Sequence, residues 1–548
     1  MTLRERITHW VELTQATKYT TAILSVVVFW GLIDNWDNEG CLSIAEYALL
    51  ATTQAMFCCL LTQNRNKTIR IIGYTFITFL CLFSFITIVC YHFWQWGINS
   101  RLIYIVTETN SNEAIEFIQT ITEQMPSFFG SWHFVGLVVA IIIVSVLVHF
   151  TSDKIYGNIA IATFGVGIVC SISYIAINIQ NRTNISLLLR VPCRIVAYFY
   201  DMQGYEEKEY IYNNQHDISL ITSAQLADVV VMIIGESSNP THWSLYGYKL
   251  NTTPQLDKMA SDIAIYTDVI PSYGTTAMAL RNMLFTYNTS TTDKLWHETI
   301  DIISLMKNSG YQTAWISNQG IVGNHGYTKL ISDRADYCIY IGAITDNDNT
   351  MKMYDLQTKP YIVDFLEENK KSFVIVHTLG SHIIYSRRYP SDFDIFTSAD
   401  IPNNNLTYWQ KRTVAEYDNS ILYTDNVIAS TISVLQADTT HTTLLLYLSD
   451  HSEDVYDTST NYYGHATRPN QQIHIPMIIW ANDKYKQQNP TIWNNLLQNA
   501  NKAYNSENVI HTIMGTTGTN YQWYNAQQDL SSDSFCVQHR YFEEKLFD

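Results

Sequence analysis

One stretch of the chain gathers two carboxylates and an imidazole within four positions. The apolar run of residues 444–448 leads into Ser449, Asp450, His451, Ser452 and Glu453. Such a run is typical of a buried strand in a parallel sheet, and ligands bind beyond the carboxyl ends of these strands. The oxygen and nitrogen donors of Asp450 and His451 suit zinc. A capped strand end is the alternative interpretation.

A second strand and a later hydroxyl segment carry matching chemistry. The predicted strand at residues 229–234 is followed by Glu236, which is either a helix cap or a natural third metal ligand. Thr275 and Thr276 precede a predicted helix at residues 278–287. A hydroxyl at a helix N-terminus is usually a cap. It is also a position where backbone N–H groups and the helix dipole assist a nucleophile that attacks an anion.

Histidines follow two of the predicted strands. His377 and His382 flank a Gly-containing turn, and His465 lies in the loop after the Asp-His strand. These three residues are predicted to contact a substrate or a metal, and Arg468 could pair with phosphate. We expect His441, His474 and His511 to be ordinary surface or core residues.

The elements that must position these groups alternate along the second half of the chain. From residue 227 onward, strands and helical stretches follow one another, which predicts a sheet of βαβ units. The candidate strands are residues 229–234, 313–317, 373–377, 443–448 and 475–480, and residues 412–436 have helical periodicity.

The first half of the chain has the composition of a membrane domain. Five apolar segments, at residues 19–33, 43–63, 71–93, 133–150 and 157–177, approach the ~20 residues that cross a bilayer as a helix. Lys and Arg cluster before the first span and in alternate loops, which predicts a cytoplasmic N-terminus and a C-terminal half outside the cytoplasm. Residues 94–132 read as amphipathic helices at the membrane surface, where Thr109 and Glu113 form part of a polar cluster.

The net charge of the 548-residue chain is -17. Phosphate backbones require basic surfaces, so this charge argues against nucleic acid as a partner.

Together these features resemble the phosphoethanolamine transferases of bacterial envelopes, which are sulfatase-like members of the alkaline phosphatase superfamily. The resemblance implies five transmembrane helices in residues 1–177, an interfacial linker at 178–226, and a periplasmic α/β sulfatase-like domain at 227–548. It also implies a multi-pass protein of the bacterial inner membrane. The expected donor is phosphatidylethanolamine, and the expected acceptor is an envelope glycolipid (lipid A or lipopolysaccharide core) or a glycan.

The resemblance also assigns roles to residues. Glu236, Thr276, Asp450 and His451 match zinc ligands, with Thr276 as the nucleophile that carries a covalent phospho-threonine intermediate. His382 and His465 match histidines that hold the phosphate or a second metal, or that serve in catalysis. Thr109 and Glu113 fall near positions that approach the lipid head group. Thr275 is a rival nucleophile, but the spacing from Thr276 to Leu280 and Met283 fits the family better.

The sequence departs from the family at several positions. Members that modify lipid A carry cysteines beside the nucleophile, where this chain has Tyr273 and Asn282. These departures bear on the acceptor more than on the chemistry. The alternatives within the same superfamily are a phosphoglycerol transferase, or a phosphodiesterase or sulfatase-like hydrolase. A catalytically inactive scaffold is a third class, although the filled ligand positions argue against it. Cys338 and Cys536 could pair, but spacing alone does not establish that they are close.

Overall fold

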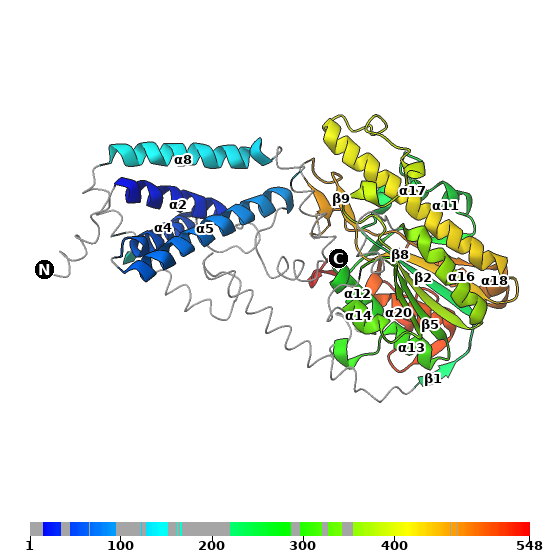
Figure 1. The fold of residues 1–548 in the computed structure, drawn as a ribbon. Coiled ribbons are helices and arrows are strands. Elements are labelled where there is room, and N and C mark those ends of the chain that lie inside the picture. The colour runs from blue at the N-terminus through cyan, green and yellow to red at the C-terminus, as the bar shows by residue number, and fades with distance from the viewer. Residues whose placement is uncertain are drawn as a thin grey trace. The chain divides into compact units, whose positions relative to one another are not determined.

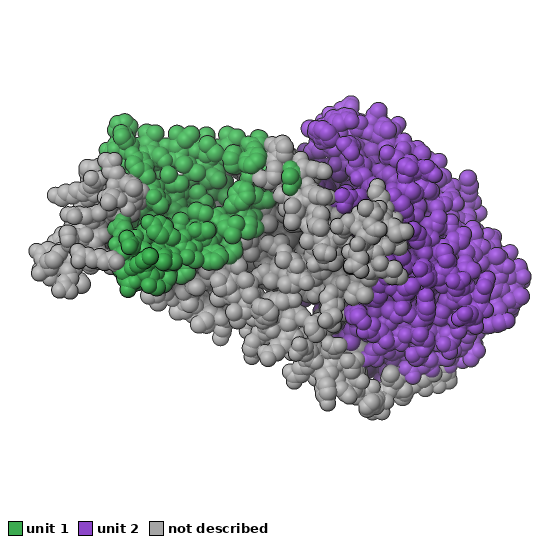
Figure 2. All heavy atoms as spheres, in the orientation of Figure 1, with its two compact units in different colours: residues 1–109, 113–203 green, residues 110–112, 204–548 purple. Residues whose placement is uncertain are grey.

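The computed structural model describes residues 15–33, 44–64, 66–94, 122, 128–151, 162, 165–166, 220–286, 296–320, 327–341, 354–460, 462–466, 468 and 470–548. The chain divides into two compact units, which Figure 2 colours separately. The first comprises Met1–Thr109 and Glu113–Gln203, and the second comprises Asn110–Asn112 and Gly204–Asp548. The main part of the second unit therefore begins inside the predicted linker.

Four long helices of the first unit lie where spans are predicted. They are α2 (Gln15–Ile33), α4 (Ile44–Thr62), α5 (Lys67–Trp94) and α8 (Trp132–Phe150). Helix α2 packs against the other three. Many large apolar side chains of α5 and α8 are exposed, among them Ile71 and Leu147, which is the distribution expected where lipid covers the surface.

One of these helices is long enough to span a membrane by itself. Lys67–Val89 of α5 meets the length and hydropathy of a span, whereas Lys18–Trp30, Ala48–Thr62 and Phe134–Phe150 are shorter apolar helices. The predicted fifth span at residues 157–177 falls almost wholly outside the described residues. Five spans therefore remain a prediction.

The second unit is built on a seven-stranded sheet with the order β3-β11-β8-β2-β7-β5-β6. Its strands are β2 (Val229–Gly235), β3 (Ile263–Tyr266), β5 (Gln312–Ser317), β6 (Tyr337–Tyr340), β7 (Ser372–His377), β8 (Thr443–Ser449) and β11 (Met477–Ala481). The strands from β8 to β6 are parallel, and β11 runs antiparallel to both β8 and β3.

The five predicted strands are present, but the βαβ pattern does not extend to the whole sheet. The β8–β11 connection includes the short ribbon of β9 (Glu453–Val455) and β10 (Tyr463–His465), and β11 then returns antiparallel. Strands β3 and β6 were not predicted from sequence. Each has four residues, too few for a clear alternation of apolar side chains.

The sheet is buried on both faces. Successive strand residues point to opposite faces, so Val230 and Met232 enter one core and Val231 and Ile233 enter the other. Figure 1 shows α12, α13 and α20 on one side of the sheet and α16 and α17 on the other. The helices of this unit are α11 (Pro254–Lys258), α12 (Thr276–Leu284), α13 (Ile302–Asn308), α14 (Tyr327–Ser332), α16 (Lys359–Glu368), α17 (Tyr408–Ala437), α18 (Asp483–Gln488), α19 (Pro490–Gln498) and α20 (Val509–Thr517).

Six further short strands form two-stranded sheets of their own among the described residues. They are β1 (Leu220–Ser223), β4 (Val269–Ile270), β12 (Tyr504–Asn505), β13 (Thr519–Tyr521), β14 (Tyr541–Phe542) and β15 (Lys545–Leu546). Strand β4 pairs with β12 immediately before the segment that carries Thr276, and β14 pairs with β15 in a hairpin.

Candidate active site

The candidate site lies where the two central strands end. Strands β2 and β8 are parallel neighbours, and their last ladder pair joins Gly235 to Ser449. The next residues, Glu236 on one strand and Asp450 and His451 on the other, therefore leave the sheet at the same edge. All three side chains are buried. The sheet topology thus brings together groups more than 200 positions apart.

The side chains of these residues converge on one point. His451 Nε2 lies 3.1 Å from Glu236 Oε1 and 3.6 Å from Asp450 Oδ2. One donor atom from each of the three residues lies within 4.8 Å of the others. This spacing is compatible with three ligands around one metal ion.

The hydroxyl of Thr276 completes the group. Its Oγ1 lies 3.2 Å from Glu236 Oε2 and 3.4 Å from His451 Nε2. Thr276 is the first residue of α12, whereas Thr275 is the N-cap residue and makes no side-chain capping bond. Of the two threonines, Thr276 is therefore the one that reaches the metal-type donors.

The surroundings of Asp450 are suited to a cation. Its Oδ1 accepts the backbone N–H groups of Ser237 and His451 at 3.2 and 2.7 Å. Its Oδ2 is buried and has no hydrogen-bond partner among the described residues. A buried carboxylate oxygen without a donor is costly, and a metal ion would satisfy it.

The charges of the three groups point the same way. Burial and the nearby charge of Glu236 raise the pKa of Asp450 well above its usual value. Burial alone would raise the pKa of Glu236, but the adjacent His451 lowers it well below its usual value. Burial alone would lower the pKa of His451, but Asp450 and Glu236 raise it to about 10. Asp450 and His451 therefore favour their protonated forms here, and a divalent cation can replace these protons. Two carboxylates, an imidazole and a hydroxyl fit tetrahedral zinc.

A tight turn supports Glu236 from the side of β7. Gly380 has φ +47°, and a Cβ at this position would lie 2.7 Å from Glu236 O, so only glycine fits. The buried carboxylate of Asp355 accepts the N–H groups of Leu379 and Gly380 at 2.8 and 2.9 Å. The turn also presents Ser381 N–H to Glu236 O at 2.9 Å. Asp355 therefore fixes the turn that leads to His382.

Gln319 is a further contact that sequence analysis missed. Its Nε2 donates to Glu236 Oε2 at 3.1 Å and to Thr378 O at 2.9 Å. Gln319 lies two residues after the end of β5. The rule that ligands gather at strand ends could have placed it near the site, but not its bond to Glu236.

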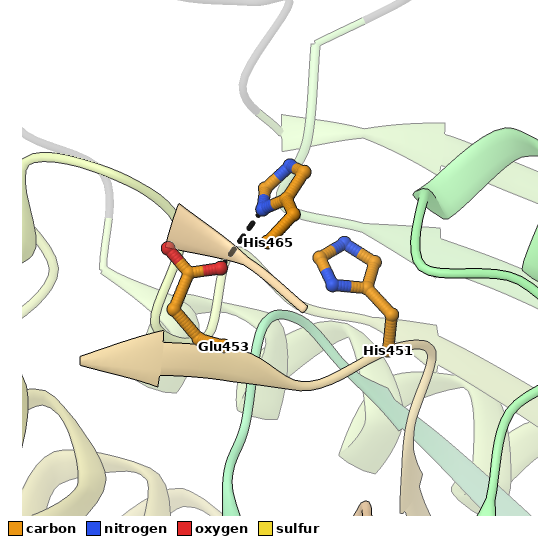
Figure 3. Close-up of side chains that lie close together, drawn as sticks. All are labelled: His451, Glu453 and His465. Carbon is orange, nitrogen blue, oxygen red and sulfur yellow. Dashed lines mark hydrogen bonds and ion pairs between the residues drawn. The ribbon is translucent and has the colours of Figure 1, made fainter. Parts of the chain in front are cut away.

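A second group of side chains adjoins the first (Figure 3). His465 Nδ1 lies 2.8 Å from Glu453 Oε2, and the hydroxyl of Tyr385 donates to Glu453 Oε1 at 2.8 Å. The His465 ring centroid is 4.3 Å from that of His451 and 6.3 Å from that of His382. His382 and His465 are therefore neighbours beside the candidate zinc ligands. Glu453 can orient His465 because the two residues pair across β9 and β10.

The remaining predicted residues are placed differently. His377 is a core residue whose ring packs against Trp315, and burial lowers its pKa to about 4. Arg468 is half-buried, and its backbone N–H donates to Gln471 Oε1 at 2.9 Å. Thr109 and Glu113 lie outside the described residues. The substrate contacts of all four residues remain predictions.

The two cysteines of the second unit do not form the disulfide that was considered from the sequence. Cys338 and Cys536 are both free and exposed.

Comparison with known proteins agrees with the fold. Residues 228–519 match the family described as Sulfatase. The chain is 30% identical over 317 residues to "Phosphoethanolamine transferase EptC" of Escherichia coli O18:K1:H7, covering 56% of this chain and 53% of that protein. It is 29% identical over 324 residues to "Phosphoethanolamine transferase EptA" of Salmonella typhimurium, covering 58% of each chain. The chain thus matches about half of the length of these relatives.

Solved structures are similar over different lengths. The C-terminal periplasmic domain of E. coli EptC in complex with Zn has a TM-score of 0.53 and 26% identity, covering 60% of this chain and 91% of that domain. The integral membrane lipooligosaccharide phosphoethanolamine transferase A of Neisseria meningitidis has a TM-score of 0.64 and 19% identity, covering 94% of this chain and 97% of that protein. The second similarity concerns the fold, and it includes the helical first half of the chain.

Proposed function

The chain belongs to the sulfatase family, and we propose that it is a zinc-dependent transferase that moves phosphoethanolamine from phosphatidylethanolamine to an envelope glycolipid or glycan. The acceptor class comprises lipid A, the lipopolysaccharide core and envelope glycans. We place the protein in the bacterial inner membrane with its second unit in the periplasm, which agrees with the apolar helices of the first unit. The names of the relatives support the donor group and the type of reaction.

The observation that carries this proposal is the position of Thr276. Its hydroxyl lies within 3.4 Å of both Glu236 and His451, at the first turn of α12. A cap residue would instead turn its hydroxyl toward the backbone of its own helix. Glu236, Asp450, His451 and Thr276 would together hold zinc. Zinc, when bound, lowers the pKa of an oxygen ligand and offsets negative charge on phosphoryl oxygens.

The first half of the reaction forms a covalent enzyme. Thr276 gives its hydroxyl proton to Glu236 Oε2, which accepts its hydrogen bond. Oγ1 then attacks the phosphorus of the donor, and the bond between phosphorus and the diacylglycerol oxygen breaks. The leaving oxygen needs a proton, which His382 or His465 can supply. Glu453 accepts the Nδ1–H of His465, so Nε2 is the ring nitrogen available to the substrate. Diacylglycerol leaves, and phosphoethanolamine remains esterified to Thr276.

The second half transfers the group to the acceptor. An acceptor hydroxyl gives its proton to the histidine that lost one and attacks the same phosphorus. The bond from phosphorus to Thr276 Oγ1 then breaks, and Oγ1 takes back the proton that Glu236 held. Because the two substrates react in turn, ping-pong kinetics are expected.

The proposal is tested by following the phosphoryl group on the protein. The full chain is reconstituted with phosphatidylethanolamine labelled in its ethanolamine group, and peptides are examined by mass spectrometry. We expect a phosphoethanolamine adduct on Thr276 in the parent, none in Thr276→Ala, and an unchanged adduct in Thr275→Ala. An adduct on Thr275, or full turnover by Thr276→Ala, would show that the nucleophile is wrongly assigned.

The same preparation distinguishes the donor. Phosphatidylglycerol replaces phosphatidylethanolamine in a parallel reaction. An adduct formed only from phosphatidylglycerol would make the chain a phosphoglycerol transferase. Release of the head group to water, with none reaching lipopolysaccharide or glycan, would make it a hydrolase.

A further inference from the structure

The hairpin of β14 and β15 has an unusual turn. Phe542 pairs with Lys545, which leaves Glu543 and Glu544 as the two turn residues. Their φ angles are 51° and 63°. Turns of this type normally carry Asn-Gly, because side chains disfavour positive φ. Two glutamates in such a turn indicate that contacts outside the hairpin hold them there.

Those contacts are to the loop that precedes Thr276. Glu543 N–H donates to Ser272 O at 2.9 Å, and Gly274 N–H donates to Glu543 Oε1 at 3.0 Å. The hydroxyl of Tyr273 donates to Glu544 Oε1 at 2.9 Å. The turn therefore engages three successive residues, the last of which is two positions before Thr276.

The hairpin is itself anchored in a small core. Phe542 is fully buried and clusters with Ile270, Ala466 and Ile473. Ile270 ends β4 directly before the Ser272 loop, and Ala466 directly follows His465. In Figure 1 the C-terminal end of the chain lies beside α12, in agreement with these contacts. The hairpin thus joins the nucleophile loop to the strand that carries His465.

The side chain of Ser272 anchors the same loop to a different part of the chain. The Ser272 hydroxyl lies 3.0 Å from Asn505 Oδ1 and 2.9 Å from Glu507 Oε2. After Gly274, by contrast, Thr275 makes no side-chain capping bond to α12. The Glu543–Gly274 bond is therefore the last of these side-chain anchors before Thr276.

We propose that Glu543 is a positioning residue for the nucleophile: its carboxylate holds Gly274 so that α12 starts with the Thr276 hydroxyl directed at Glu236 and His451. This inference rests on the proposed nucleophilic role of Thr276. Displacing a reacting group by about 1 Å can cost roughly 100-fold in rate. Loss of the Glu543 acceptor should therefore lower kcat, while the binding of lipid and metal continues.

Two substitutions separate this role from a purely structural one. Glu543→Gly keeps the turn, because glycine accepts positive φ readily, but it removes the acceptor for Gly274 N–H. Glu543→Gln keeps a side-chain oxygen that can accept the same bond. Gln225→Gly is the matched control, since Gln225 is exposed and also has a positive φ, of 50°, but lies outside the site.

The full chain in lipid nanodiscs is examined by hydrogen exchange of the peptide containing residues 271–280, and by transfer kinetics. In Glu543→Gly we expect faster exchange of this peptide and a fall in kcat of about 10- to 100-fold, with KM and zinc content unchanged. Glu543→Gln and Gln225→Gly should match the parent in both measurements.

Each of the other outcomes contradicts a particular step of this inference. Unchanged exchange in Glu543→Gly would show that Glu543 does not hold the loop before Thr276, whatever the activity. Faster exchange with unchanged kcat would show that the Glu543–Gly274 bond holds the loop but does not position the nucleophile. If the parent forms no adduct on Thr276, the proposed function fails. The exchange result alone then decides whether Glu543 holds the loop at residues 272–274.

Discussion

The two carboxylate oxygens of Asp450 have different surroundings. One of its oxygens accepts two backbone N–H groups, and the other is buried without a donor among the described residues. Neighbouring Glu236 adds a like charge, which is why the pKa of Asp450 rises after burial has already raised it. A bound cation would coordinate the oxygen that lacks a donor and would also offset the repulsion between Asp450 and Glu236.

This arrangement predicts the metal content of variants. Asp450→Asn removes the charge but keeps the size of the side chain, so zinc binding should fall by more than the roughly 10- to 100-fold that outer-shell partners cost. Zinc in the purified full chain is measured by elemental mass spectrometry, with Asp438→Asn, at the end of α17, as the control. Full zinc occupancy in Asp450→Asn would place the metal elsewhere.

At the scale of elements, a cluster around the buried His242 joins α17 to the loops that follow β2 and β9. His242 lies between two carboxylates, with Nδ1 2.6 Å from Asp418 and Nε2 3.2 Å from Asp457. Asp457 also accepts Asn239 Nδ2–H at 3.1 Å. Burial alone would lower the pKa of His242, but Asp457 and Asp418 raise it to about 10. The imidazole is therefore charged and is compensated on both sides.

Removing this imidazole should be costly. His242→Ala leaves the buried carboxylate of Asp418 uncompensated beside the partly exposed Asp457, which predicts a loss of about 3–5 kcal/mol in unfolding free energy. His441→Ala removes a partly exposed pair with Asp438 and should cost less than about 1 kcal/mol. Chemical denaturation of the full chain in detergent compares the two variants. Equal losses would mean that the buried cluster contributes no more than a surface pair.

The pH dependence of the same cluster has a definite sign. The folded pKa of His242, about 10, lies above the value near 6.5 of an unfolded histidine. Its stabilisation is therefore complete below pH 6.5 and is lost as the pH rises toward 10. The difference between parent and His242→Ala should shrink over this interval. A difference that grows with pH would contradict a charged His242.

At the scale of the whole molecule, the charge pattern predicts a topology. Lys and Arg cluster before the first predicted span and in alternate loops, which places these loops in the cytoplasm and the second unit outside it. A reporter that is active only in the cytoplasm, fused after Asp548, should be silent, and the same reporter in the loop at residues 64–70 should be active. The reverse pattern would overturn the orientation.

Acid should destabilise the second unit through a buried neutral histidine. His511 of α20 is buried, which lowers its pKa to about 4. This pKa is below that of a histidine in the unfolded chain. The contribution of His511 to the unfolding free energy is therefore fully present above pH 6.5 and is lost as the pH falls toward 4. The contribution amounts to at most about 3 kcal/mol. Thermal melts of His511→Gln should therefore show a shallower loss over this range than the parent. The exposed His539→Gln is the control, and equal slopes in the parent and both variants would exclude the effect.

Local sequence determined the framework of this protein. Continuous apolar runs such as residues 229–234 and 443–448 are required by strands that are buried on both faces, so β2 and β8 were predictable. Polar residues directly after such strands must then share one edge of the sheet. For this reason Glu236, Asp450 and His451 could be named as partners before their geometry was known.

Only the tertiary structure decided the rest. Thr275 and Thr276 are adjacent and chemically identical, but Thr275 is the N-cap, whereas Thr276 begins α12 and its hydroxyl reaches Glu236 and His451. Gln319 reaches Glu236, and Glu543 reaches Gly274, across long separations in sequence. Neither contact leaves a periodic signal in the sequence, because side-chain hydrogen bonds between distant loops depend on how the elements pack. Periodicity determines the elements, whereas the contacts that orient reacting groups arise only when those elements assemble.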